Sequence, residues 1–193
     1  MTITTPFRIT ICGIDELSGH GAVGVSHVLS ILDPDWPIPE AFGSFGEHER
    51  CELRFHDVIE DDPGMVPPRD EDVARLLAFG RDILAEPAPN AHLLVHCHAG
   101  VSRSTASMIL MVAQAQPERT ASSVASEILR IRPQAWPNLH IVEMGDVQLG
   151  RGGRLVSAAV GIYRQRLTER PELARSMTEC GRGREVTVAR GSA

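Results

Sequence analysis

Residues 92–115 decide the fold, and they read HLLVHCHAGVSRSTASMILMVAQA. The apolar run from His92 to Val95 is typical of a short strand that is buried on both faces. A loop follows from Cys97 to Arg103, and the almost wholly apolar stretch from Ser104 to Ala115 predicts a helix in the middle of a domain. This order places Cys97 at the carboxyl end of a sheet, which is where open α/β folds bind their ligands.

Patterns on either side of this segment extend the same architecture. Strands are expected at residues 7–12, 25–32 and 51–55, and helices at 73–84, 121–130, 139–149 and 155–167. The sequence therefore predicts a single α/β domain over residues 1–170, with a central, mostly parallel sheet and helices on both faces. Residues 171–193 are polar and lack a clear period, so a flexible C-terminal tail is expected there.

Composition narrows the chemistry. The 193 residues carry a formal net charge of −6, which argues against a large nucleic-acid footprint. All 19 basic residues are arginine, so a Walker-type phosphate loop, a Schiff-base lysine and a lysine general base are excluded. An anion must therefore be bound by arginine, by helix ends or by backbone N–H groups.

The four cysteines are scattered without paired spacing. Cys12 and Cys51 lie in strand-like stretches and are interpreted as core residues. The N-terminal stretch lacks the apolar run of a signal peptide, and no segment is long and apolar enough to span a membrane, so a cytoplasmic protein is expected. Cys97 differs from the other cysteines because of the residues that follow it.

The loop after Cys97 has the chemistry of an anion site. Backbone N–H groups from His98, Ala99, Gly100, Val101 and Ser102 can converge with the start of the following helix, forming a nest that favours the Cys97 thiolate. Arg103 adds a planar fork that can hold two phosphoryl oxygens. Ser104 is placed to donate a hydrogen bond to Cys97, and His96 is expected to order the loop from behind.

This His-Cys, five residues, Arg-Ser pattern resembles the signature of the cysteine-dependent tyrosine and dual-specificity phosphatases. Residues 25–31, VSHVLSI, resemble the second strand of that family, and residues 132–138, RPQAWPN, resemble its turn between two late helices. The resemblance covers residues 7–150 in pattern. It implies hydrolysis of a phosphomonoester through a phosphocysteine intermediate, without a metal or cofactor.

The family also implies an aspartic acid that protonates the leaving oxygen, on a loop after the strand at 51–55. Asp57 follows that strand directly and is favoured, with Asp61 and Asp62 as alternatives. Asp57 lies farther from Cys97 than is usual in the family, and the stretch from Pro63 to Asp70 is interpreted as an insertion.

Several functions remain open at this point. We expect the substrate to be phosphotyrosine in proteins, with phosphoserine and phosphothreonine as further candidates. The alternatives are the same chemistry on a lipid, nucleotide or RNA phosphate, and a phosphate-binding module without catalysis. The sequence does not determine the oligomeric state.

Overall fold

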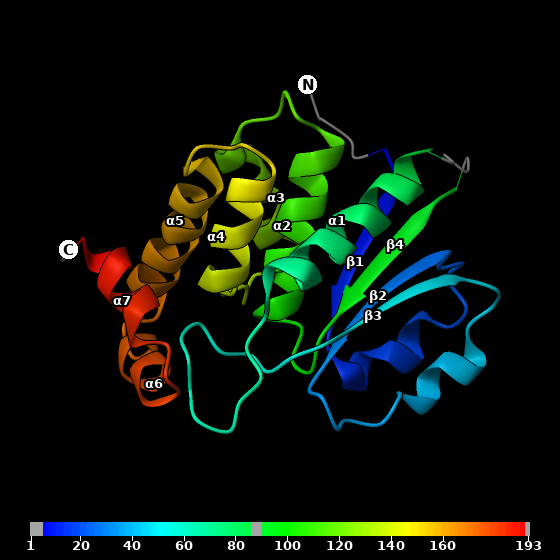
Figure 1. The fold of residues 1–193 in the computed structure, drawn as a ribbon, viewed down its shortest axis with the longest axis horizontal. Helices are drawn as coiled ribbons and strands as arrows, with labels where there is room; N and C mark the ends of the chain where they lie inside the picture. Colours follow the sequence, from blue (N-terminus) through cyan, green and yellow to red (C-terminus); the bar gives the residue numbers. More distant parts are fainter. Residues whose placement is uncertain (1–5, 86–89, 192–193) are drawn as a thin grey trace.

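The computed structural model describes residues 6–85 and 90–191, and it contains a four-stranded parallel sheet. The strands are β1 (Arg8–Cys12), β2 (His27–Leu32), β3 (Glu49–Arg54) and β4 (His92–His96), in the spatial order β1-β4-β2-β3 (Figure 1). In register, His96 pairs with Cys12 on one side and with Ser30 on the other. The α/β class and the parallel sheet are thus confirmed, and the strands end at one common edge.

The α-helices cover one face of this sheet. They are α1 (Asp70–Ala85), α2 (Arg103–Ala115), α3 (Ala121–Ile131), α4 (Leu139–Gln148) and α5 (Arg154–Glu169), followed by α6 (Leu173–Glu179) and α7 (Gly183–Arg190). Helix α2 packs on β1 and β4, and its residues 103–113 are all buried. The expectation of a central apolar helix after the cysteine loop is therefore correct.

The other face of the sheet differs from the prediction. Within residues 6–85 and 90–191, this face carries two short 3-10 helices, η1 (Ile14–His20) and η2 (Glu40–Ser44) (Figure 1). Leu17 of η1 and Phe42 of η2 pack with Val28 and Leu94 in a small apolar cluster. The connection that carries η1 is rich in glycine and the connection that carries η2 is rich in proline, which explains why long helices do not form there.

Residues 171–191, where the sequence predicts a flexible tail, instead form α6 and α7. Helix α7 packs against α5, and Val186 and Ala189 are buried. Arg182 and Glu185 are also buried, at 5% and 0% exposed. A short segment that is fixed by buried polar side chains lacks the apolar period on which a helix prediction depends, so its sequence pattern does not indicate these helices.

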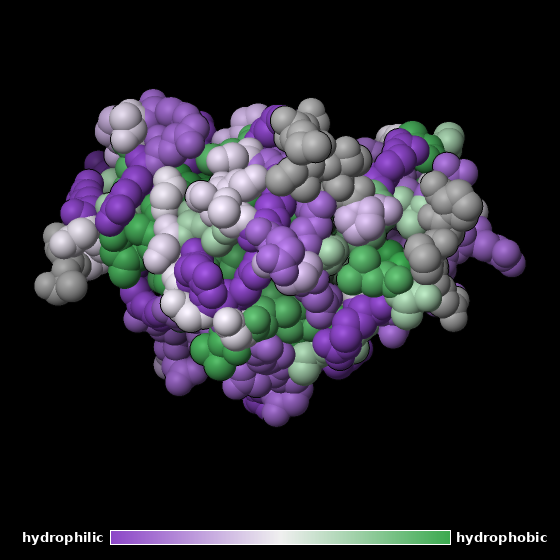
Figure 2. Space-filling view, turned by 90° about the horizontal axis from the view of Figure 1, so that it is seen from above, coloured by the Kyte–Doolittle hydropathy of each residue, from purple (hydrophilic) through white to green (hydrophobic). Residues whose placement is uncertain are grey.

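Seen from above, hydrophilic residues surround scattered apolar patches (Figure 2). Among the described residues, none of the helices has the length and apolar character needed to cross a membrane.

Candidate active site

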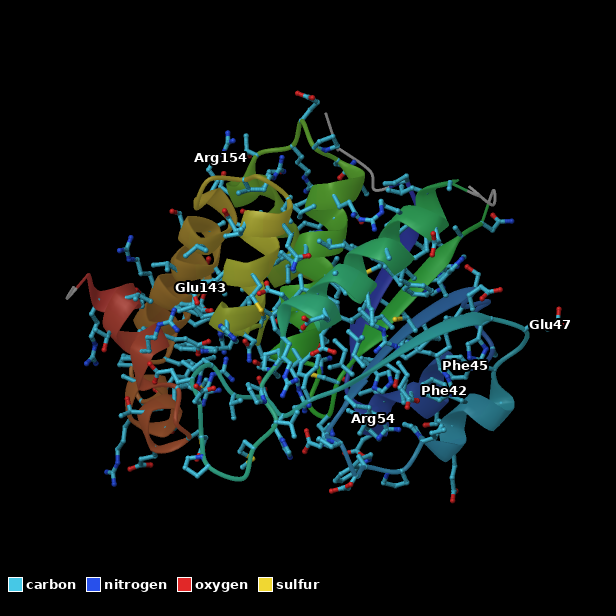
Figure 3. All side chains as sticks on the ribbon, in the orientation of Figure 1. Phe42, Phe45, Glu47, Arg54, Glu143 and Arg154 are labelled. Atoms are coloured by element: carbon cyan, nitrogen blue, oxygen red, sulfur yellow. The ribbon has the colours of Figure 1, made fainter. Side chains whose placement is uncertain are left out.

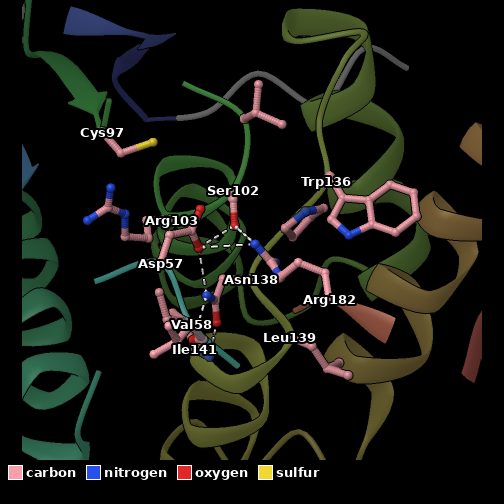
Figure 4. A network of polar contacts seen from close by, with 12 residues as sticks. Asp57, Val58, Cys97, Ser102, Arg103, Trp136, Asn138, Leu139, Ile141 and Arg182 are labelled. Carbon is pink, nitrogen blue, oxygen red and sulfur yellow. Dashed lines mark hydrogen bonds and ion pairs between the residues drawn. The ribbon is translucent and has the colours of Figure 1, made fainter. Parts of the chain in front are cut away.

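The loop from Cys97 to Ser102 connects β4 to α2 at the carboxyl edge of the sheet. Cys97 is 2% exposed, and its Sγ lies 3.2 Å from the hydroxyl oxygen of Ser104. The first turn of α2 therefore lies directly beside the sulfur (Figure 4). The proximity of Cys97 and Ser104 agrees with the sequence prediction.

The carbonyl groups of this loop point away from its centre, because neighbouring segments donate hydrogen bonds to them. The acceptors and donors are His98 O from Ile14 N (2.9 Å), Ala99 O and Gly100 O from the Arg132 guanidinium (2.9 Å each), Val101 O from Trp136 N (2.9 Å) and Ser102 O from Asn138 N (3.3 Å). Within the described part of the chain, the N–H groups of residues 98–103 donate no hydrogen bond. These donors are available to an anion above Cys97, as a backbone nest requires.

Arg132 is held in turn by Glu16 of η1, in a two-pronged ion pair at 2.8 and 2.7 Å. The same Glu16 accepts a hydrogen bond from the N–H of Gly13. The end of β1, the first 3-10 helix and the turn at residue 132 thus support the loop from its outer side. The sequence pattern identified the turn at 132–138 but assigned no role to Arg132 or Glu16.

Gly100 is the loop residue that has to be glycine. Its φ is +69°, and a Cβ at this position would lie 2.4 Å from the carbonyl carbon of Cys12. The loop is therefore packed against the end of β1 more closely than any side chain permits.

Arg103 is fixed by one of its nitrogens. Nη1 donates to Asp33 Oδ1 at 2.7 Å and to the carbonyl oxygen of Phe55 at 2.6 Å. Its Nε is buried and has no hydrogen-bond partner among the described residues. An orphaned buried donor is costly, so this edge of the guanidinium is suited to receive phosphoryl oxygens.

Asp33 was not found from the sequence, although it directly follows β2. It lies at the carboxyl edge because β2 is a neighbour of β4, and this placement is the only signal that could have identified it. The side chain of Arg54, the last residue of β3, donates hydrogen bonds to the carbonyls of Asp33 and Pro34 and holds this segment (Figure 3).

The two histidines beside Cys97 have different surroundings. His96 is fully buried and its Nε2 lies 2.8 Å from Ser30 Oγ, and burial lowers the pKa of His96 to about 4. His98 accepts a hydrogen bond from the backbone N–H of Asp33 through Nε2, and burial together with Arg103 lowers the pKa of His98 as well. Both imidazoles are therefore neutral near pH 7.

Asp57 lies at the rim of the loop (Figure 4). Its Oδ1 accepts hydrogen bonds from Ser102 Oγ at 2.7 Å, Asn138 Nδ2 at 2.8 Å and Arg182 Nη1 at 3.2 Å. The other two candidates, Asp61 and Asp62, are exposed on the loop that follows. Of the three aspartates, the structure thus brings Asp57 to the cysteine loop, and it adds Arg182, which the sequence had placed in a tail.

The described residues contain no group of three or more His, Cys, Asp or Glu side chains arranged to hold a metal ion. The acidic and sulfur-bearing groups near Cys97 instead hydrogen-bond to arginine, serine and asparagine.

Comparison with known proteins gives matches in structure alone. No protein-family model matches the chain, and no curated protein matches it in sequence. Human DUSP28 is similar with a TM-score of 0.56 at 14% identity, over 74% of this chain and 92% of its own. The human tyrosine phosphatase-like serine/threonine/tyrosine-interacting protein gives 0.52 at 15% identity, over 72% and 86%.

PTPMT1, solved in complex with PI(5)P, gives a TM-score of 0.52 at 13% identity, over 78% of this chain and 93% of its own. At these identities the likeness shows a shared fold. The fold is that of the dual-specificity and tyrosine phosphatases.

Proposed function

We propose that the protein is a cysteine-dependent phosphomonoester hydrolase that acts on phosphotyrosine in proteins. The observation that carries the proposal is the cysteine loop. Neighbouring segments donate hydrogen bonds to the loop carbonyls, and the loop N–H groups remain available to bind an anion. The Nε of Arg103 also has no hydrogen-bond partner among the described residues, so it can donate to an oxygen of the same anion. Preorganised donors of this kind stabilise the charge on a transferring phosphoryl group.

The reaction proceeds in two steps. The Cys97 thiolate attacks phosphorus, the bond from phosphorus to the leaving oxygen breaks, and Asp57 gives that oxygen its proton. Water then attacks the phosphocysteine, Asp57 takes a proton from it, and the sulfur leaves as a thiolate. Ser104, 3.2 Å from Sγ, stabilises the departing thiolate by a hydrogen bond.

The hydrogen bonds around Asp57 support one of its two oxygens as the proton carrier. Oδ1 already accepts three hydrogen bonds, whereas Oδ2 accepts none from the described residues. Oδ2 is therefore the oxygen that carries the proton to the leaving group. With its side chain 32% exposed, Asp57 is accessible to a substrate.

A protein phosphotyrosine fits the surroundings better than a lipid headgroup does. The ring of Trp36 lies 4.4 Å from that of His98 and is 44% exposed, so it offers an apolar surface to an aromatic ring. Glu60, Asp61 and Asp62 are exposed on the loop after Asp57 and repel a substrate with several phosphates.

Two other functions have a specific observation in their favour. The neighbour PTPMT1 was solved with PI(5)P, which supports a lipid phosphate, and another neighbour is named as an interacting protein, which supports binding without catalysis. Binding without catalysis is the weaker alternative, because Cys97, Arg103 and Asp57 are all present and lie in or beside the same loop.

The test is hydrolysis of para-nitrophenyl phosphate, a phosphotyrosine peptide, a phosphoserine peptide and a phosphoinositide, with EDTA and a reducing agent present. Wild type, Cys97→Ser and Asp57→Ala are compared. We expect metal-independent turnover that Cys97→Ser abolishes, with the phosphotyrosine peptide preferred. Vanadate binding without turnover of any substrate would instead favour the binding module.

A further inference from the structure

Arg182 connects the C-terminal helices to the proposed acid. Its Nη1 donates to Asp57 Oδ1 at 3.2 Å and to Ser102 Oγ at 3.0 Å, although Arg182 lies 125 residues after Asp57. Ser102 in turn donates to the same Oδ1. The three side chains form a closed triangle at the rim of the cysteine loop (Figure 4).

The other nitrogen of Arg182 is fixed in the interior. Nη2 donates to Glu185 Oε1 at 2.6 Å, and Glu185 also accepts hydrogen bonds from the indole N–H of Trp136 and from the backbone N–H of Leu139. Burial works to lower the pKa of Arg182, but Asp57 and Glu185 raise it overall. The guanidinium is thus a permanent charge whose position is set by the turn at 132–138 and by the start of α4.

Arg182 is the charged partner among the three donors to Oδ1, since Ser102 and Asn138 are neutral. Arg184, two residues later, donates a hydrogen bond at 3.4 Å to the carbonyl of Ile59, in the segment that follows Asp57. The α6–α7 segment therefore holds the beginning of a long connection between β3 and α1. In Figure 1 this connection lies beside α6.

We propose that Arg182 is a positioning residue for the general acid, so that the C-terminal helices are part of the catalytic apparatus. By holding Oδ1, Arg182 orients Oδ2 toward the leaving oxygen. Without Arg182, Oδ1 keeps only the neutral donors Ser102 and Asn138, so the carboxyl is held less firmly and proton transfer becomes less efficient while the phosphate site stays intact. This inference rests on the proposed function, with Asp57 as the acid.

The experiment compares Arg182→Met with Arg175→Gln. Arg175 lies in the same segment but pairs with Glu179 on the surface, so it is a matched control. For a phosphotyrosine peptide, Arg182→Met should lower kcat by about 10- to 100-fold, part of the roughly 100- to 10,000-fold that a positioned acid contributes. KM, vanadate affinity and the rate of phosphoenzyme formation from para-nitrophenyl phosphate, whose leaving group needs little protonation, should stay near wild type.

Two further variants keep the test decisive. Arg182→Met leaves Glu185 buried without its charged partner, so Arg182→Met/Glu185→Gln, which leaves no unpaired buried charge, is measured in parallel. In an Asp57→Asn background, adding Arg182→Met should lower kcat no further, because the acid that Arg182 positions is already absent.

The outcomes separate the two claims. No turnover by wild type would overturn the proposed function and this inference together. Turnover by wild type with Arg182→Met equal to Arg175→Gln would overturn the inference alone. An equal further loss in the Asp57→Asn background, or a matching loss of vanadate affinity, would show that Arg182 supports the loop through Ser102 instead of positioning Asp57.

Discussion

Replacing Gly100 by alanine tests how closely the cysteine loop is built against β1. A Cβ on Gly100 would lie 2.4 Å from the carbonyl carbon of Cys12 and 2.6 Å from both the oxygen of Cys12 and the nitrogen of Gly13. All three are backbone atoms at the end of β1, which is hydrogen-bonded to β4 along its length, so none can move aside alone. Gly152 is the matched control, because its φ is +60° and a Cβ there meets nothing within 4 Å.

The two substitutions share one cost and differ in the other. A left-handed backbone costs an alanine about 1 kcal/mol at either position. The clash at Gly100 adds roughly 1–3 kcal/mol of overpacking. We therefore expect Gly100→Ala to lower the free energy of unfolding by about 2–4 kcal/mol and Gly152→Ala by about 1 kcal/mol.

Urea unfolding gives the free energies, and a vanadate titration shows whether the loop keeps its shape. Gly100→Ala should also weaken vanadate binding, because the loop can relieve the clash only by moving its N–H groups away from the anion. Gly152→Ala should bind vanadate as wild type does. Equal destabilisation by the two variants, or unchanged vanadate affinity in Gly100→Ala, would refute this description of the loop.

Three more substitutions test the surroundings of the loop. Arg132→Met should weaken vanadate binding by at least about tenfold, because it removes charged hydrogen bonds to two loop carbonyls, each worth about 1.5 kcal/mol; an unchanged titration would contradict this. Asp33→Asn should raise the vanadate Kd about fivefold, since a partly exposed ion pair with Arg103 contributes about 1 kcal/mol. An unaltered Kd would contradict a role for Asp33 in positioning Arg103. The pKa of His96 is lowered from 6.5 to about 4, so the unfolded chain binds the proton first and stability falls with pH below 6.5. Between pH 8 and pH 5, the free energy of unfolding in urea should fall by about 2 kcal/mol more for wild type than for His96→Asn. Equal decreases in the two proteins would contradict a neutral buried His96.

The sequence predicted the part of the site that is local. Strand β4, the loop and helix α2 are consecutive, so the positions of Cys97, Arg103 and Ser104 follow from one stretch of chain. The strands and the long helices were predicted to within a few residues because each has its own apolar period.

The parts that the sequence did not predict are pairings between distant residues. Asp33 meets Arg103 across 70 positions, and Glu16 meets Arg132 across 116. Such pairs depend on strand order and on the packing of turns, which no local pattern expresses. The C-terminal helices were missed for the related reason that buried ion pairs fix them as much as apolar contacts do.

The central claim is that Cys97 forms a covalent phosphoenzyme. Wild type and Cys97→Ser are mixed rapidly with a phosphotyrosine peptide in EDTA, quenched with acid and digested for mass spectrometry. We expect wild type to carry a transient phosphoryl group on the peptide that contains Cys97, and Cys97→Ser to lack both this adduct and turnover. Turnover by Cys97→Ser, or a phosphoryl group on another residue of a turning-over wild type, would contradict the account.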